Sequence, residues 1–125
     1  MALSPKAQEI LVKAVELINM PNRWIKGAGY RSGPEGAHHY YCSLGALDKA
    51  ARIVMSNRSE YSADAYNEAR GAVAKTMSKL GYEDFDIAYW NDAPERTHAD
   101  VKAAFCKTLK RELQEGASND TRREG

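Results

Sequence analysis

Apolar residues near the N-terminus recur every three or four positions, and this spacing lines one face of an α-helix. The stripe comprises Ala7, Ile10, Leu11, Ala14, Leu17 and Ile18. Ser4 and Pro5 precede it, a pair typical of a helix start because serine caps the backbone and proline fits the first helical turn. The stripe stops near Met20, and Pro21 follows. The sequence therefore predicts an amphipathic helix that ends before Pro21.

Three further stretches show the same helical spacing. They are predicted to run from between His39 and Ser43 to about Met55, from Ser59 or Ser62 to Leu80, and from Thr97 to about Gln114. Gly81 follows the third stretch at a position where glycine often ends a helix. Asp100, three residues after Thr97, forms an acidic version of the capping box. Residues 85–90 add a short aromatic element that we assign to a helical turn, with a short strand as the alternative.

The first two helices are separated by residues 21–37, which are rich in glycine and proline and predict a long loop. A short strand or turn is expected around Trp24, and loops of this length are often functional. Gly27–Gly29 is a poor match to a nucleotide-binding loop, because no apolar strand precedes it and no Gly-Lys-Ser/Thr follows. We therefore predict an all-α fold, a compact bundle of about four helices with this loop packed across it.

The bulk composition limits the number of domains and the partners. A length of 125 residues suits one domain, which we place at residues 1–115, and residues 116–125 have nothing to bury and predict a disordered polar tail. The 18 basic and 17 acidic residues give a net charge of +1, so no overall field attracts nucleic acid or an anionic membrane. The sequence has no apolar run of the ~20 residues that span a bilayer, and no secretory signal pattern. We expect a cytoplasmic protein without a membrane partner.

The most distinctive segment runs from Trp90 to Thr97. It places an aromatic ring, an amide, a carboxylate and a guanidinium within a few residues, which suits a planar polar ligand or the peptide groups of a partner. Together with the loop, the predicted binding residues are Trp24, Lys26, Trp90, Asn91, Asp92 and Arg96. The alternative is a structural role, with the polar side chains satisfying loop backbone groups, Arg96 pairing with Asp92, and Trp90 anchoring the core.

Cys42 carries a catalytic hypothesis. Its predicted place in the first turn of a helix favours the thiolate form, and His38, His39 or His98 could then act as a base. The alternative is that Cys42 is a small buried apolar residue. Cys42 and Cys106 form no Cys-x-x-Cys pair, and we expect both to remain free thiols.

We expect no metal and no cofactor. The neighbouring His38 and His39 point in different directions on a regular element, and the predicted helices carry no His-x-x-x-His or Glu-x-x-His pair. Basic and aromatic residues do alternate in the loop, at Arg23, Lys26, Tyr30, Arg31, Tyr40 and Tyr41. Such a pattern can contact single-stranded nucleic acid, but the rest of the chain adds no basic field, so this partner is not favoured.

Three strings of residues together resemble a family of small uncharacterised proteins found in phages and in bacteria, actinobacteria especially. They are Arg23-Trp24-Ile25-Lys26-Gly27-Ala28, Tyr41-Cys42-Ser43-Leu44-Gly45-Ala46-Leu47 and the most specific of the three, Trp90-Asn91-Asp92-Ala93-Pro94-Glu95-Arg96-Thr97. The resemblance covers roughly residues 7 to 110, and Glu95 stands where glycine is common. It implies no activity, but it implies that the three strings belong to one design and that the protein originates from a mobile element.

These observations favour a binding protein over an enzyme. The expected partner is a host protein or a small-molecule ligand, and a phage or prophage origin suggests action against a host defence. The first alternative is a cysteine-dependent hydrolase or transferase that uses Cys42, and the second is a nucleic-acid-binding accessory protein. The sequence leaves the oligomeric state open.

Overall fold

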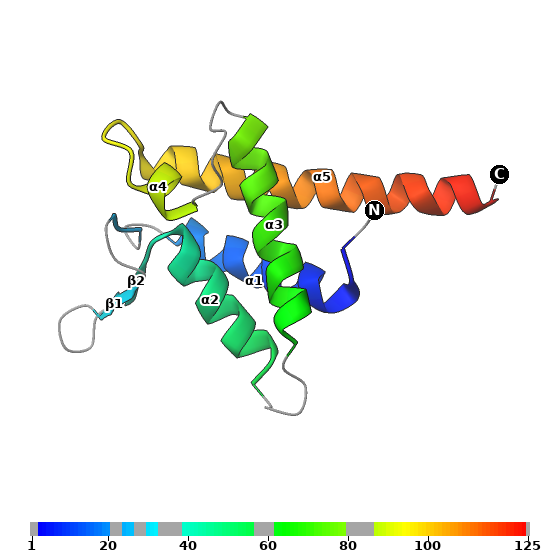
Figure 1. The fold of residues 1–125 in the computed structure, drawn as a ribbon, viewed down its shortest axis with the longest axis horizontal. Coiled ribbons are helices and arrows are strands. Elements are labelled where there is room, and N and C mark those ends of the chain that lie inside the picture. The colour runs from blue at the N-terminus through cyan, green and yellow to red at the C-terminus, as the bar shows by residue number, and fades with distance from the viewer. Residues whose placement is uncertain are drawn as a thin grey trace.

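The computed structural model describes residues 3–20, 24–26, 30–32, 39–56, 62–79 and 87–124. This part of the chain forms four long helices, one short helix and a two-stranded ribbon (Figure 1). The elements in chain order are α1 (Pro5–Asn19), β1 (Tyr30–Ser32), β2 (His39–Tyr41), α2 (Ser43–Val54), α3 (Ala63–Lys79), α4 (Ile87–Asn91) and α5 (His98–Glu124). The helices pack against one another, so the predicted all-α class is confirmed.

Helix α1 packs against α2, α3 and α5. Its buried face includes every residue of the predicted stripe, and Val15 joins them. Ser4 caps the helix as predicted, since its Oγ accepts a hydrogen bond from the Ala7 N–H at 3.3 Å. Glu68 of α3 accepts two further bonds, from the N–H and the hydroxyl of Ser4, both at 3.0 Å. The start of α1 is therefore fixed to α3.

The core is continuous across the helices. Its largest fully buried apolar side chains are Trp90, Phe105, Ile10, Leu11, Ile18, Leu47 and Ile87. Burial of one such side chain stabilises a fold by about 1.5–3 kcal/mol. Since these residues come from α1, α2, α4 and α5, the core holds the short α4 in place beside the long helices.

Before α2 the chain forms a ribbon that the sequence pattern does not predict. Strands β1 and β2 pair antiparallel, with Tyr30 opposite Tyr41. Strands of three residues are too short to show a period in the sequence. Helix α2 begins at Ser43, the late end of the predicted range, because the preceding residues pair with β1 and Cys42 caps the helix.

The loop before the ribbon contacts it where a short strand or turn is expected. Trp24 forms a parallel bridge with Tyr41, and the N–H of Ile25 donates to the carbonyl of Tyr41 at 3.1 Å. Both strands lie at the end of the bundle where α2 begins and α4 lies (Figure 1). The described part of the loop is therefore joined to the helices through β2.

Helices α3 and α5 begin at predicted caps. The Ser62 hydroxyl accepts from the Ala65 N–H at 3.2 Å. At α5, the Thr97 N–H donates to Asp100 Oδ2 at 3.0 Å and the Asp100 N–H donates to Thr97 Oγ1 at 3.2 Å, which confirms the capping box.

Helix α5 is longer than predicted. It continues past Gln114 to Glu124, so residues 116–124 are helical where the sequence predicts a disordered tail. Gly116 costs a helix only about 1 kcal/mol, and no proline follows it. The C-terminal part of α5 extends beyond the other helices (Figure 1).

Some predicted features lie outside the described residues, and these are Arg23, Gly27–Gly29, His38, Ser59, Leu80 and Gly81, together with the side chains of Tyr30, Arg31, His39 and Tyr40. Among the described residues, no helix has both the length and the apolar character of a membrane span.

Candidate functional site

Asn91, the last residue of α4, is fully buried and joins three segments of the chain. Its Oδ1 accepts hydrogen bonds from Trp24 Nε1 at 2.6 Å and from both the N–H and the hydroxyl of Ser43, at 3.0 and 2.7 Å. Its Nδ2 donates to the carbonyl of Ile25 and to Asp92 Oδ1, each at 3.0 Å. Donors face one end of the amide and acceptors the other, so its orientation is determined. We call Trp24, Ile25, Ser43 and Asn91 the Asn91 clasp.

Two more contacts fix the loop at the clasp. Lys26 Nζ donates to the carbonyls of Ala93 and Pro94, at 2.9 and 3.0 Å, and lies 5.7 Å from the centre of the Trp24 ring. The half-buried Trp24 also stacks on His98, with centroids 6.0 Å apart and planes 13° from parallel. The loop cation and the loop aromatic are therefore both engaged with the turn and the helix start that follow α4.

Trp90 and Arg96 form a second contact within the predicted segment. The guanidinium carbon of Arg96 lies 3.8 Å from the centre of the Trp90 ring, and Arg96 Nε donates to the Trp90 carbonyl at 2.8 Å. Trp90 is only 2 % exposed, and its Nε1 has no hydrogen-bond partner among the described residues. A cation over a desolvated indole stabilises by about 2 kcal/mol, which offsets the cost of the unpaired N–H.

The structure thus brings together five of the predicted binding residues and places the sixth, the exposed Asp92, beside Asn91. Trp90 and Asn91 are buried, and the bonds of Asn91 are used within the chain. The structural role weighed at the sequence level fits this geometry. Direct binding of a ligand by these residues stays a prediction.

Cys42 is buried and caps α2, and its Sγ accepts from the Gly45 N–H at 3.4 Å. Burial raises the pKa of the Cys42 thiol, and the charge of Asp92 acts in the same direction, against the backbone N–H groups that lower it. An activated cysteine needs the opposite shift. The candidate base His98 is occupied as well, because its Nε2 lies 2.6 Å from the carbonyl of Ile18. This arrangement does not favour the hydrolase hypothesis.

A groove between α2 and α3 was not predicted from the sequence. It has a volume of about 610 Å³ and is lined by Leu44, Gly45, Asp48, Lys49, Arg52, Tyr66 and Arg70. Leu44 and Tyr66 pack against the core, so they form an apolar floor. Asp48 pairs with Arg52 at 3.2 Å, while Lys49 and Arg70 have no acidic partner among the described residues. We call this hollow the α2–α3 groove.

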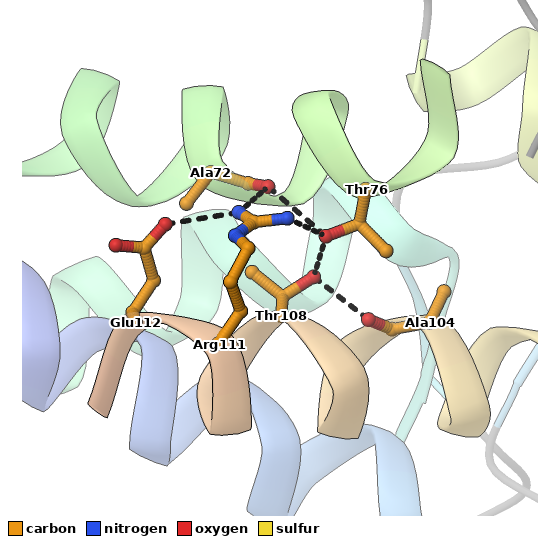
Figure 2. Close-up of polar contacts among 6 residues, drawn as sticks. All are labelled: Ala72, Thr76, Ala104, Thr108, Arg111 and Glu112. Carbon is orange, nitrogen blue, oxygen red and sulfur yellow. Dashed lines mark hydrogen bonds and ion pairs between the residues drawn. The ribbon is translucent and has the colours of Figure 1, made fainter. Parts of the chain in front are cut away.

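A buried polar network between α3 and α5 also escaped prediction (Figure 2). Arg111 donates to Thr76 Oγ1 at 2.7 Å, to the Ala72 carbonyl at 2.9 Å and to Glu112 Oε1 at 2.9 Å. Thr108 donates to Thr76 Oγ1 at 2.6 Å. Arg111 Nε and Glu112 Oε2 are buried without a hydrogen-bond partner among the described residues.

One sequence signal could have pointed to the network. Val101, Phe105, Thr108 and Glu112 share one helical face, and the two polar members of that stripe had to be buried if the apolar members were. The stripe does not predict which residues of α3 Thr108 and Glu112 contact. Among the described residues, no group of three or more His, Cys, Asp and Glu side chains is arranged to hold a metal ion.

These features define a small helical protein with an internal amide clasp and a cationic groove. The chain belongs to DUF6197, a family of unknown function, whose model matches residues 3–111. The resemblance to an uncharacterised family is therefore confirmed. Neither a curated protein nor a solved structure matches the chain.

Proposed function

We propose that this protein acts by binding and that it holds a small organic anion in the α2–α3 groove. The observation that carries the proposal is the combination of an apolar floor with two cations, Lys49 and Arg70, that have no acidic partner among the described residues. The groove volume of about 610 Å³ lies within the range of about 300–1,000 Å³ that is usual for small-molecule sites.

The side chains of the groove suggest the chemistry of the ligand. Leu44 and Tyr66 offer an apolar surface to a flat or aliphatic portion. Arg52 and Arg70 present planar guanidinium groups, which bind carboxylate or phosphate through two parallel hydrogen bonds. Among the described residues that line the groove, three are cationic (Lys49, Arg52 and Arg70) and one, Asp48, is acidic. This excess of positive charge favours an anionic ligand over a neutral or cationic one.

The Asn91 clasp supports this proposal as a positioning element. Asn91 binds both the N–H and the hydroxyl of Ser43, the first residue of α2. Leu44 and Gly45 follow directly in the chain and line the groove. The clasp therefore fixes the N-terminal end of α2, where Leu44 and Gly45 line the groove. This arrangement gives Asn91 a role without direct contact to the ligand.

The biological part of the proposal is sequestration of this ligand in the cytoplasm by a protein of phage or prophage origin, as an action against a host defence. Its support is the resemblance carried by the Trp-Asn-Asp-Ala-Pro-x-Arg-Thr motif. A second candidate is binding of a host protein at the surface beside the clasp. That candidate rests on the exposed Lys26 and Asp92 beside the half-exposed Trp24 and Arg96.

The test uses the fluorescent aromatic sulfonate ANS as the probe, because it combines a flat apolar body with one negative charge. We expect saturable ANS binding to the native protein, weakened at least about fivefold in Arg70→Gln, the effect of one charge contact in water. Lys75→Gln removes the same charge from an exposed residue of α3 outside the groove and should leave binding unchanged. Absence of saturation, or equal effects of the two substitutions, would refute the proposal.

A further inference from the structure

Beside the α3–α5 network the surface is hollowed into a pocket of about 350 Å³. It is lined by Thr76, Lys107, Lys110, Arg111 and Gln114. Three of these five residues are cationic and none is acidic. Lys107, Lys110, Arg111 and Gln114 lie on one face of α5, because three- and four-residue steps separate them. We call this hollow the α5 pocket.

Arg111 is held rigidly at the pocket wall. Three hydrogen bonds fix its guanidinium to Thr76 and Ala72 of α3 and to Glu112, its neighbour on α5 (Figure 2). Its side chain is only 17 % exposed. A guanidinium fixed in this way loses little conformational freedom when it binds a ligand.

Arg111 has hydrogen-bonding capacity that these contacts do not use. A guanidinium carries five N–H groups, and the three bonds engage one on Nη1 and two on Nη2. Nε is buried and has no acceptor among the described residues. The second N–H of Nη1, which has no acceptor among the described residues either, is therefore the donor left for a ligand. Glu112 and Thr76 lie on opposite sides of the guanidinium in Figure 2, and the lining of the pocket includes Thr76 but not Glu112.

The charges around the pocket match a dianion. Glu112 pairs with Arg111 at 2.9 Å and offsets its charge. Lys107 and Lys110 have no acidic partner among the described residues, so two positive charges are left uncompensated in the lining. Lysine ammonium groups on flexible stems bind phosphate as point charges, whereas arginine binds it through directed N–H groups.

We propose that the α5 pocket is an oxyanion site for a dianionic phosphate group, with Arg111 as the fixed donor and Lys107 and Lys110 as the mobile charges. The phosphate is either inorganic or the terminal group of a small phosphomonoester. The site is distinct from the α2–α3 groove, since the two linings share no residue, and it does not depend on the function proposed for the groove.

The test is a titration of the folded protein with inorganic phosphate, followed by NMR at constant ionic strength with chloride as the balancing anion. We expect saturable shifts of the Arg111 Nε–H signal and of the amides of residues 107–114. The double variant Lys107→Gln/Lys110→Gln should bind phosphate at least about 25-fold more weakly, given the loss of two charge contacts of about fivefold each. The matched control Lys6→Gln/Lys13→Gln removes the same charge from α1 and should bind as the parent does.

A titration with glycerol phosphate forms the second arm of the test. Tighter binding of this monoester than of inorganic phosphate assigns the site to a phosphorylated small molecule. Tighter binding of inorganic phosphate assigns the site to that ion. Either result supports the site. Shifts that do not saturate, or that the two double variants reduce equally, would mean an adventitious ion only and would overturn the proposal. Salt-dependent DNA binding through the two lysines without phosphate saturation would overturn it in favour of a nucleic-acid surface.

Discussion

The Asn91 clasp and the Arg111–Glu112 network are both buried polar clusters at contacts between helices, yet they differ in how fully their groups are bonded. Both ends of the Asn91 amide are satisfied by five bonds to the chain. Among the described residues, the network leaves one buried donor, Arg111 Nε, and one buried acceptor, Glu112 Oε2, without a partner. A cluster whose polar groups are all hydrogen-bonded holds the segments that it connects rigidly together. The incompletely bonded network, in contrast, lies beside the pocket for which we propose a phosphate ligand.

Removal of the clasp should have the largest effect on stability. Asn91→Ala removes the partner of the buried Ser43 N–H and of two partly buried groups, Trp24 Nε1 and the Ile25 carbonyl. We expect the free energy of unfolding to fall by about 3–5 kcal/mol, measured by urea denaturation. Asn67→Ala, at an exposed position of α3, is the matched control and should change it by less than about 0.5 kcal/mol. Equal effects of Asn91→Ala and Asn67→Ala would show that the clasp does not stabilise the fold.

The network should behave differently under the same measurement. Glu112→Leu leaves the Arg111 charge without its counterion, and we expect a loss of about 2 kcal/mol, less than for a fully buried pair because Arg111 retains some exposure. Replacing Arg111 by Met in the same chain should restore most of this loss, since an apolar pair of similar volume is often as stable as a buried ion pair. A double variant as unstable as the sum of the single variants would contradict this view.

Cys42, next to the clasp, tests how tightly that region is closed. Its buried thiol has a raised pKa, whereas Cys106 is exposed. Iodoacetamide at pH 7 should therefore modify Cys42 at least about tenfold more slowly than Cys106, and the rate at Cys42 should rise towards alkaline pH. Mass spectrometry of tryptic peptides measures both rates, and Cys106→Ser isolates the slower one. A faster reaction at Cys42 would revive the nucleophile hypothesis.

The smallest effect is expected at the capping box where the clasp segment enters α5. The Thr97 N–H lowers the pKa of Asp100 below its usual 3.8. A carboxyl group whose folded pKa is lowered adds stability above its unfolded pKa, and this stability is lost as the pH falls through the folded pKa. The stability difference between the parent and Asp100→Asn should be present at pH 6 and vanish well below pH 3.8. A difference that persists at pH 2 would assign the effect to something other than the carboxylate.

The sequence was informative where the structure is local. The α1 stripe, the Ser4 cap and the Thr97–Asp100 box each involve residues within a few positions of one another, and each is confirmed. The importance of Asn91 was visible from its chemical setting, but its partners Trp24 and Ser43 lie far away in the chain.

The α2–α3 groove and the α5 pocket depend on how whole helices pack. Arg70 faces α2 and Arg111 faces α3 only because of the relative placement of these helices, which a periodic pattern does not contain. The buried Glu112 runs against the usual exposure of charged residues. Its burial follows from its place on the apolar face of α5.

The central claim is that ligands bind in the α2–α3 groove and that the Asn91 clasp only positions α2. The most direct test is an NMR titration of the native protein with ANS, which compares the groove and the clasp in one experiment. We predict saturable amide shifts at residues 44–52 and 66–70. The two tryptophan indole N–H signals provide the comparison, because Trp24 Nε1 is bonded to Asn91 and Trp90 Nε1 is buried, and both should stay in place. Shifts centred on these indole signals and on residues 90–96, with the groove unchanged, would contradict the account and place binding at the clasp.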